Sequence, residues 1–538
     1  MSDAPKARSL VSIAGIVAVA TLISKVFGLL RQQAIAAVFG VGAAVDAYNY
    51  AYVIPGFLLI LLGGINGPFH SAMVSALSKR DRDEAEPLVE TMTTLVGGIL
   101  LAVTLLIFIF ADVLIDLVAP GLGQSAAGTE IRAIAIAQLR IMSPMALFAG
   151  LIGIGFGTLN AADHYWLPSI SPLFSSSAVL LALGMLALSL GRDITAPQYA
   201  LLGGVVLAWG TLGGAVLQWL IQIPVQWRAG LGRLRLRFDL KQPGIRDVLQ
   251  VMGPATFSSG MMQINVYTDL FFASFIPQAA AALSYANLLV QTPLGIVSNV
   301  ILVPLLPVFS RLAGPENRDE LKARIRQGLM LTAVTMLPLS ALIMTLALPA
   351  VRVVYERFAF DQDASRLVTS VLIAYGAGMF VYLGRDVLVR VFYGLGDGAT
   401  PFRISIANIV LNAVLDYWLV NAYGAPGLVL ATVGVNAVSM VLLLILLDRK
   451  LGGLPWQDWL RPFAGLIVAS GLAGVASWGT RLLLEQQLGS ETLVQQLIVL
   501  VSGGLIGLTL FGAIALRLDI PEVQLLANQV MRKLGRSR

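Results

Sequence analysis

Long apolar runs dominate this sequence and leave few ways for it to fold. A membrane-spanning helix needs about 20 apolar residues in succession, and we count fourteen such runs along the chain. They lie at about residues 10–39, 44–77, 88–118, 131–160, 168–190, 197–227, 247–276, 279–310, 323–348, 366–395, 401–421, 426–447, 461–483 and 494–516. The runs are continuous and do not alternate with period two, which argues against a membrane β-barrel. The sequence therefore predicts an all-α integral membrane protein with fourteen transmembrane helices.

The composition agrees with a membrane protein. Of the 538 residues, 57% are hydrophobic and only 12% are charged, whereas soluble domains have about 25% charged residues. So few charges argue against a soluble enzyme, and so much apolar content argues against a disordered chain. The chain has no cysteine and only two histidines. These counts argue against zinc, iron–sulfur and histidine metal sites.

The basic residues are distributed unevenly between the two sides of the predicted membrane. Most of the 36 Lys and Arg residues fall at the N-terminus, in every second loop and in the C-terminal tail. On the first part of this side they are Lys6, Arg8, Lys79, Arg80, Arg82, Arg228, Arg233, Arg235, Arg237, Lys241 and Arg246. The positive-inside rule places this side, with both termini, in the cytoplasm. The net charge of +6 thus reflects topology, and we expect no nucleic-acid partner.

An internal repeat links the two halves of the chain. Pro55 and Pro293 lie inside apolar runs at an offset of 238 positions, and Pro168 and Pro401 begin runs at an offset of 233. Runs 1–6 and 7–12 are therefore predicted to form two parallel six-helix lobes, an arrangement typical of transporters. The alternative is a chance alignment of proline-containing turns. The predicted domains are the first lobe at 1–228, the second lobe at 229–450, and residues 451–538 with the last two helices and a cytoplasmic tail.

Three cations of the first half lie inside apolar runs. Lys25 and Arg31 fall in the first run, and Arg140 falls in the fourth. Charges within a membrane are costly and are usually functional, and an arginine can grip phosphate oxygens with two parallel hydrogen bonds. A bend at Gly28 would turn Lys25 and Arg31 toward a common cavity. These residues indicate an anion site; the alternative is that their side chains extend to the membrane interface.

The second half carries intramembrane groups of the opposite sign. Asp269 lies in the seventh run and Thr432 in the twelfth, while Asn412 and Asp416 share one helix face in the eleventh. Such an oxygen-only ligand set suits a hard cation such as Na⁺. One alternative is a protonatable carboxylate that couples transport to H⁺. The other is a structural role for Asp416 near an interface.

Three further stretches have less specific interpretations. Arg385, Asp386 and Arg390 in the tenth run either pair with one another or extend toward the cytoplasm. The alternating stretch 233–237 indicates a basic segment that faces lipid on the cytoplasmic side rather than a nucleic-acid site. The aromatic loop at 352–366 has no role that the sequence specifies.

Motifs spread over nearly the whole chain point to a known family. They are Ser24-Lys25-Val26-Phe27-Gly28-Leu29-Leu30-Arg31, Phe39-Gly40, Asp46-Ala47-Tyr48, Gln138-Leu139-Arg140, Pro144, Leu159-Asn160, Pro168, Val391-Phe392-Tyr393, Asp397, Thr400-Pro401 and the series Asn408, Asn412 and Asp416. In this order they resemble the MurJ (MviN) family of lipid II flippases in the MOP exporter superfamily. Fourteen helices also match that family, whereas the related drug exporters and O-antigen flippases usually have twelve.

The resemblance implies a two-lobed transporter, not an enzyme, in the bacterial cytoplasmic (inner) membrane. The family moves lipid II, the lipid-linked peptidoglycan precursor, by alternating access. The three cations of the first half would then bind pyrophosphate, and Asp46 stands where the family has its helix-2 acid. The four oxygen-bearing residues of the second half match a Na⁺ site of some members, so Na⁺ is the one cofactor we expect, as a coupling ion. We expect a monomer among membrane lipids, with the last two helices holding the polyprenyl tail.

The sequence departs from the family at several cationic positions. Leu59 and Ile60 follow Pro55 where members often have arginine, and Leu288 stands at another such position in the eighth run. The predicted cavity is thus less cationic, which leaves open another polyprenyl-pyrophosphate-linked sugar as the substrate. Two other functions remain as alternatives. One is a multidrug or polysaccharide exporter of the same superfamily, and the other is a scaffold for envelope assembly that transports nothing.

Overall fold

The computed structural model describes residues 10–64, 67–233, 235–239, 241–242, 244–261 and 263–533. Lys6 and Arg8, which contribute to the predicted charge bias, lie outside these ranges. All regular secondary structure within them is helical, which confirms the predicted all-α class.

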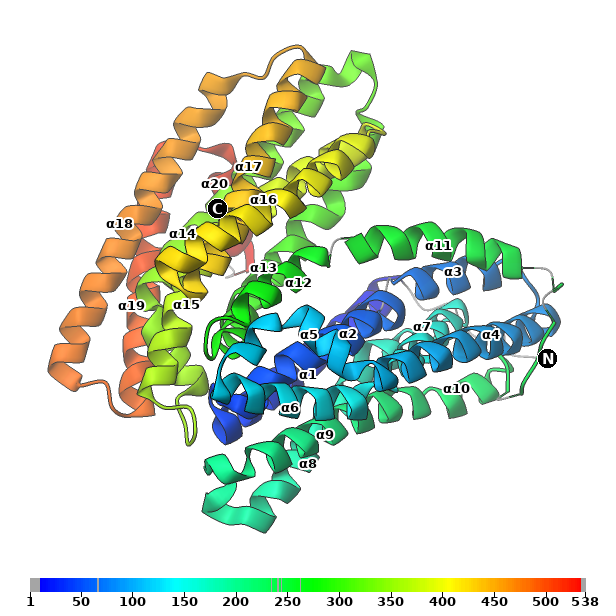
Figure 1. Cartoon of the computed structure of the whole chain (residues 1–538). Helices are drawn as coiled ribbons and strands as arrows, with labels where there is room; N and C mark the ends of the chain where they lie inside the picture. The colour runs from blue at the N-terminus through cyan, green and yellow to red at the C-terminus, as the bar shows by residue number, and fades with distance from the viewer. Residues whose placement is uncertain are drawn as a thin grey trace. The chain divides into compact units, whose positions relative to one another are not determined.

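The chain divides into two compact units, of which the first comprises Met1–Ala281 and Phe358–Phe360. Its helices are α1 (Leu10–Phe39), α2 (Ala43–Gly63), α3 (Pro68–Leu77), α4 (Arg82–Ile109), α5 (Ala111–Val118), α6 (Ala126–Met142), α7 (Met145–Ala161), α8 (Trp166–Leu190), α9 (Ala200–Leu220), α10 (Ile223–Arg228), α11 (Ile245–Met261) and α12 (Ile264–Ala273) (Figure 1). Residues 229–281, which the sequence analysis groups with the second lobe, belong to this unit. The reason is that α11 packs against α3.

The second unit comprises Ala282–Arg357 and Asp361–Arg538. Its helices are α13 (Ala279–Arg311), whose first turn still belongs to the first unit, α14 (Arg318–Tyr355), α15 (Gln362–Gly394), α16 (Ala399–Tyr423), α17 (Ala425–Leu451), α18 (Trp456–Leu488), α19 (Leu493–Ala515) and α20 (Pro521–Lys533). Helix α14 packs along α15, α18 and α19, and α17 packs along α15 and α16 (Figure 1).

Each of the fourteen predicted runs corresponds to helix, but the count of fourteen spans is not confirmed. Among the described residues, twelve helices are long and apolar enough to cross a membrane. A thirteenth span results if α6 and α7, which meet at 42°, are taken together. The run at 247–276 is divided between α11, with 17 residues, and α12, with 10. Each is shorter than the about 20 residues that a straight span requires.

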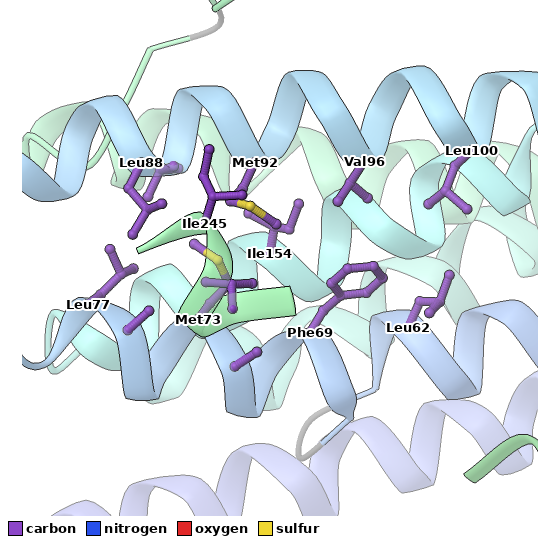
Figure 2. Close-up of a cluster of buried hydrophobic side chains, with 14 of the residues drawn as sticks. Leu62, Phe69, Met73, Leu77, Leu88, Met92, Val96, Leu100, Ile154 and Ile245 are labelled. Carbon is purple, nitrogen blue, oxygen red and sulfur yellow. The ribbon is translucent and has the colours of Figure 1, made fainter. Parts of the chain in front are cut away.

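A buried apolar cluster holds several helices of the first unit together. On α4, Leu88, Met92, Val96 and Leu100 recur every four residues and so share one face. Figure 2 shows this face packed against side chains from four other helices, namely Leu62, Phe69, Met73, Leu77, Ile154 and Ile245. Small residues allow the backbones to approach closely, as is common between membrane helices.

The repeat predicted from the prolines is visible in two helices. Both α8 and α16 have 25 residues, and each carries its proline, Pro168 or Pro401, in the third position. Both end at a glycine with positive φ, 56° at Gly191 and 64° at Gly424. Length, proline and terminal glycine therefore recur at the same offset of 233 positions. This agreement favours a true repeat over a chance match of turns.

Candidate functional site

The two cations of α1 lie in different surroundings. Lys25 is exposed, whereas Arg31 is half-buried. The Nε atom of Arg31 is fully buried and has no hydrogen-bond partner among the described residues. Helix α1 continues through Gly28 without interruption, so the predicted bend does not end the helix. Arg31 therefore has a buried hydrogen-bond donor that is available to a ligand.

Two stacked tyrosines of α2 belong to the surroundings of Arg31. Neither was predicted from the sequence to be a site residue. Tyr48 lies within electrostatic range of Arg31. Its ring stacks on that of Tyr52, with centroids 5.3 Å apart. Its hydroxyl is 3.1 Å from the hydroxyl of Thr211 on α9. The Asp46-Ala47-Tyr48 motif was the available signal. The structure adds that Tyr48 lies within electrostatic range of Arg31.

Arg140 lies on α6, three residues before the bend between α6 and α7. Its side chain is exposed, and its carbonyl accepts a hydrogen bond from Ser143. Both α1 and α6 pack against α2. Within the described part of the chain, no hydrogen bond or ion pair joins Lys25, Arg31 and Arg140, and none of them has a carboxylate partner. The first unit thus presents three uncompensated cations on helices of the membrane region.

Asp46 lies at the first turn of another helix. It is 2% exposed on α2, and its Oδ1 accepts a hydrogen bond of 2.9 Å from the backbone N–H of Ala281. The amides of Gln278 and Ala280 also bond to this carboxylate. These groups form the first turn of α13, where unpaired N–H groups and the helix dipole favour an anion. The acid expected from the resemblance is therefore the cap of α13.

The predicted cation ligands of α16 are brought together. Asn412 and Asp416 are both fully buried, and Asn412 Nδ2 donates to Asp416 Oδ2 at 2.6 Å. This contact confirms the shared face predicted from the spacing. The face continues to Asn408, which is also buried. A membrane helix that buries three polar side chains along one face is unusual, and the arrangement points to a specific role.

The other two predicted ligands lie on separate elements. Thr432 is on α17, which packs along α16. Asp269 lies on α12 of the first unit and is half-buried. Among the described residues, no three His, Asp or Glu side chains converge to hold a metal. The pair on α16 with Thr432 has one carboxylate, which suits a monovalent cation better than a divalent one.

The charged group on α15, with two arginines and one aspartate, contains one ion pair. Arg385 Nη1 lies 3.5 Å from Asp386 Oδ1, and its Nε donates to Ser439 on α17 at 3.2 Å. Of the two interpretations drawn from the sequence, pairing describes Arg385. Arg385 therefore differs from Lys25, Arg31 and Arg140, none of which has a carboxylate partner among the described residues.

Asp397, part of one family-like motif, joins the start of α16 to the end of α17. It accepts hydrogen bonds from the Thr400 backbone at 3.1 Å and from the Thr400 hydroxyl at 2.9 Å. Lys450 Nζ lies 2.6 Å from its Oδ2. The hydrogen bond from Lys450 lowers the pKa of Asp397 below its usual value. The contacts of Asp397 therefore indicate a structural role, which is to connect α16 with α17.

The positions at which the sequence departs from the family are apolar in structure as well as in sequence. Leu59 and Leu288 are half-buried on α2 and α13, and Ile60 is exposed on α2. None of them supplies a charge, so the predicted anion site of the first unit rests on Lys25, Arg31 and Arg140.

The fold as a whole is one found in solved membrane transporters. A structure of a lipid II flippase MurJ in an inward closed conformation matches with a TM-score of 0.73 and 22% identity, covering 97% of this chain and 99% of that chain. An inward-facing multidrug resistance MATE family transporter of the MOP superfamily matches with a TM-score of 0.59 and 16% identity, covering 82% of this chain and 98% of that chain. These likenesses define the class of fold: a polytopic helical fold that solved membrane transporters share.

Sequence comparison identifies the family within that class. The family model "Lipid II flippase MurJ" matches residues 35–499. A "Probable lipid II flippase MurJ" of Synechocystis sp. is 57% identical over 98% of both chains. A "Lipid II flippase MurJ" of Burkholderia cenocepacia is 30% identical over 88% of this chain and 89% of its own length. The chain belongs to the MurJ family of lipid II flippases, which are transporters rather than enzymes.

Proposed function

We propose that this protein moves lipid II from one leaflet of the membrane to the other. Membership of the family supports this function. The observation that carries it is the set of three membrane cations, Lys25, Arg31 and Arg140, which lack carboxylate partners among the described residues. A pyrophosphate is the kind of anion that such cations would neutralise.

The proposed mechanism is alternating access without covalent chemistry. The cations of the first unit attract the pyrophosphate, and Arg31 donates its buried Nε–H to a phosphate oxygen. Tyr48 and Tyr52 offer an aromatic wall beside that group. The polyprenyl tail stays in the bilayer along α18 and α19, which pack against each other. Only the polar head group then has to cross.

Complementation tests this function directly. We expect the wild-type gene to sustain growth of a bacterium depleted of its own lipid II flippase. Lys25→Gln and Arg31→Gln should each weaken pyrophosphate binding about 10- to 100-fold, the cost of losing a charged hydrogen bond, and so prevent rescue. Arg318→Gln, which removes an exposed cation at the start of α14, is the matched control. Failure of the wild type at normal membrane levels would refute the function, and rescue by both variants would refute the role of the cations.

The apolar Leu59, Ile60 and Leu288 support a second candidate substrate. A less cationic site suits another polyprenyl-pyrophosphate-linked sugar as well as lipid II. Native mass spectrometry of the purified protein separates the two by the mass of the lipid that remains bound. Binding of drugs without any polyprenyl lipid would instead favour an exporter. A scaffold without transport would tolerate neutral substitutions at all three cations.

We further propose that a monovalent cation, Na⁺, binds at Asn412, Asp416 and Thr432 of the second unit. A cation can drive transport only if it binds the two conformations with different affinity. Asp416→Ala should abolish the dependence of lipid flipping on a sodium gradient. Asp386→Asn, on neighbouring α15, is the control. Flipping that stays equally sodium-dependent in Asp416→Ala would exclude the site, and flipping that follows a proton gradient would favour H⁺.

We place both termini in the cytoplasm and the protein as a monomer in the bacterial inner membrane. The positive-inside distribution of basic residues supports this orientation. Fusion of a reporter that is active only in the cytoplasm to the C-terminus tests the orientation. Activity of a reporter that folds only in the periplasm would reverse it.

A further inference from the structure

A basic segment connects α10 to α11 and has no part in the proposed transport site (Figure 1). We call residues 233–239, of which Leu234 lies outside the described residues, the basic strap. Its described backbone is not helical. Arginines alternate with apolar residues along it, with Arg233, Arg235 and Arg237 at odd positions and Leu236 and Phe238 at even ones.

Backbone hydrogen bonds hold the basic strap along α4. The N–H of Arg233 donates to Glu90 Oε1 at 3.1 Å, and the N–H of Arg237 donates to Thr94 Oγ1 at 3.0 Å. Glu90 and Thr94 are both buried and are one helical turn apart. Because these contacts use the main chain of the strap, they fix its path and leave most of its side chains available.

The side chains of the strap are exposed and only partly neutralised. Leu236 is 84% exposed and Phe238 is 79% exposed. Arg237 Nη1 lies 3.7 Å from Glu90 Oε2. Arg233 and Arg235 are exposed and form no ion pair with a described residue. Asp239, also exposed, is the one acid within the strap.

The anchoring residues set the depth of the strap in the membrane. From Glu90 to Ile109, α4 carries no further charge and is about 29 Å long at 1.5 Å per residue. That length matches the about 30 Å thickness of the hydrocarbon layer. Glu90 therefore lies at one edge of this layer, where lipid phosphates meet acyl chains, and Thr94 lies one helical turn, about 6 Å, further in. Trp227, 51% exposed in α10, is of the type that anchors proteins at this level.

We propose that the basic strap is a membrane-surface site for anionic phospholipid headgroups. Arg233 and Arg235 bind the lipid phosphates, and Leu236 and Phe238 insert among the upper acyl methylenes. The bound lipid is distinct from the cargo and stabilises the strap against the bilayer. The depth of the strap in the membrane and the charge of its arginines support this site.

The chain has no cysteine, so Phe238→Cys gives a unique site for an environment-sensitive fluorophore. The full-length labelled protein is reconstituted in vesicles of phosphatidylcholine alone or mixed with phosphatidylglycerol. We expect a blue shift of the emission in the mixed vesicles, and we expect Arg233→Gln with Arg235→Gln to abolish that shift. Arg311→Gln with Arg318→Gln removes the same charge from exposed positions around the α13–α14 connection and should leave the shift intact.

Three outcomes would overturn the proposal. Identical emission in both kinds of vesicle would show that the strap does not bind anionic lipid, and would leave an acidic protein partner as the better explanation of its charge. A shift that persists in the Arg233/Arg235 variant would exclude these side chains. Reversal of the shift by inorganic phosphate would assign the site to free phosphate. Native mass spectrometry of the unlabelled protein supplies a second measurement, in which the same double variant should lose bound phosphatidylglycerol and keep its thermal unfolding temperature.

Discussion

Asp46 illustrates how a single buried charge can be used as a helix cap. Its carboxylate lies at the first turn of α13, where the Ala281 amide donates to it. Asp46 is the only acidic residue of α2, so no other side chain of that helix could supply a carboxylate here. The amides at the start of α13 and the carboxylate of Asp46 supply hydrogen-bond partners to each other, and both would otherwise be buried without one.

Replacing Asp46 should destabilise the first unit in proportion to what is removed. Asp46→Asn keeps an acceptor oxygen and loses the charge, whereas Asp46→Ala leaves the α13 amides without a partner. We expect a cost of about 1–3 kcal/mol for the alanine variant and a smaller one for asparagine. Thermal unfolding of the purified protein in detergent measures both. Equal unfolding temperatures for wild type and Asp46→Ala would contradict the capping role.

The sequence predicted the position and sign of the intramembrane charges but not their partners. Arg31 and Asp416 stand out in sequence because charge inside an apolar run is costly. The spacing of Asn412 and Asp416 also predicted that they share one helix face, because four residues make about one helical turn, and the structure adds the hydrogen bond between them. The partner of Asp46 could not be predicted, since Ala281 is 235 residues away and offers only a main-chain amide.

At the scale of helices, glycine decides how closely α7 approaches α2 and α3. A Cβ on Gly153 would overlap the carbonyl oxygen of Leu62, and one on Gly157 would lie 2.6 Å from Met73 Cβ. Both neighbours are backbone or stiff side chain, so the helices would have to move apart.

Gly153→Ala should therefore lower the thermal unfolding temperature, with a cost of about 1–3 kcal/mol as for other overpacked cores. Gly184→Ala on α8 is the control, because nothing lies within 4 Å of its added Cβ. Alanine there should be neutral, or slightly stabilising through its better helix propensity. The prediction fails if the two variants unfold alike.

The Asp397–Lys450 contact should make the connection between α15, α16 and α17 sensitive to acid. Because the Lys450 hydrogen bond lowers the pKa of Asp397, the contact stabilises the fold above the ordinary value of 3.8. That stabilisation is lost as pH falls through the folded pKa. Asp397→Asn should lower the unfolding temperature by about 2 °C at pH 7, as expected of one partly exposed ion pair. The difference from wild type should vanish below the folded pKa, and a constant difference at all pH values would contradict this explanation.

At the scale of the whole chain, the segment Phe358–Phe360 belongs to the first unit although its neighbours in sequence belong to the second. Phe360 is 1% exposed, whereas Phe358 is 87% exposed. The Ala359 N–H donates to the carbonyl of Ala37 on α1 at 3.0 Å. The buried ring of Phe360 and this main-chain bond both hold the short segment in place.

Phe360→Ala should release this segment, because removing a buried phenylalanine costs about 3–5 kcal/mol. We expect faster cleavage of the segment by a protease and a lower unfolding temperature. Phe358 lies two residues earlier and is exposed, so Phe358→Ala should change neither the rate of cleavage nor the unfolding temperature. Equal protease sensitivity of the two variants would show that the buried ring does not hold the segment.

The sequence by itself determined the class of protein, the helical segments and the sites of costly charge. These features follow from local quantities, namely the length of an apolar run, its period and the price of a charge in it. The tertiary structure alone decided that residues 229–281 pack with the first unit, that Asp46 caps α13, and that the basic strap lies along α4. Each of these depends on contacts between segments far apart in the chain. Many such pairings bury similar apolar surface, so only specific packing and hydrogen bonding select one of them.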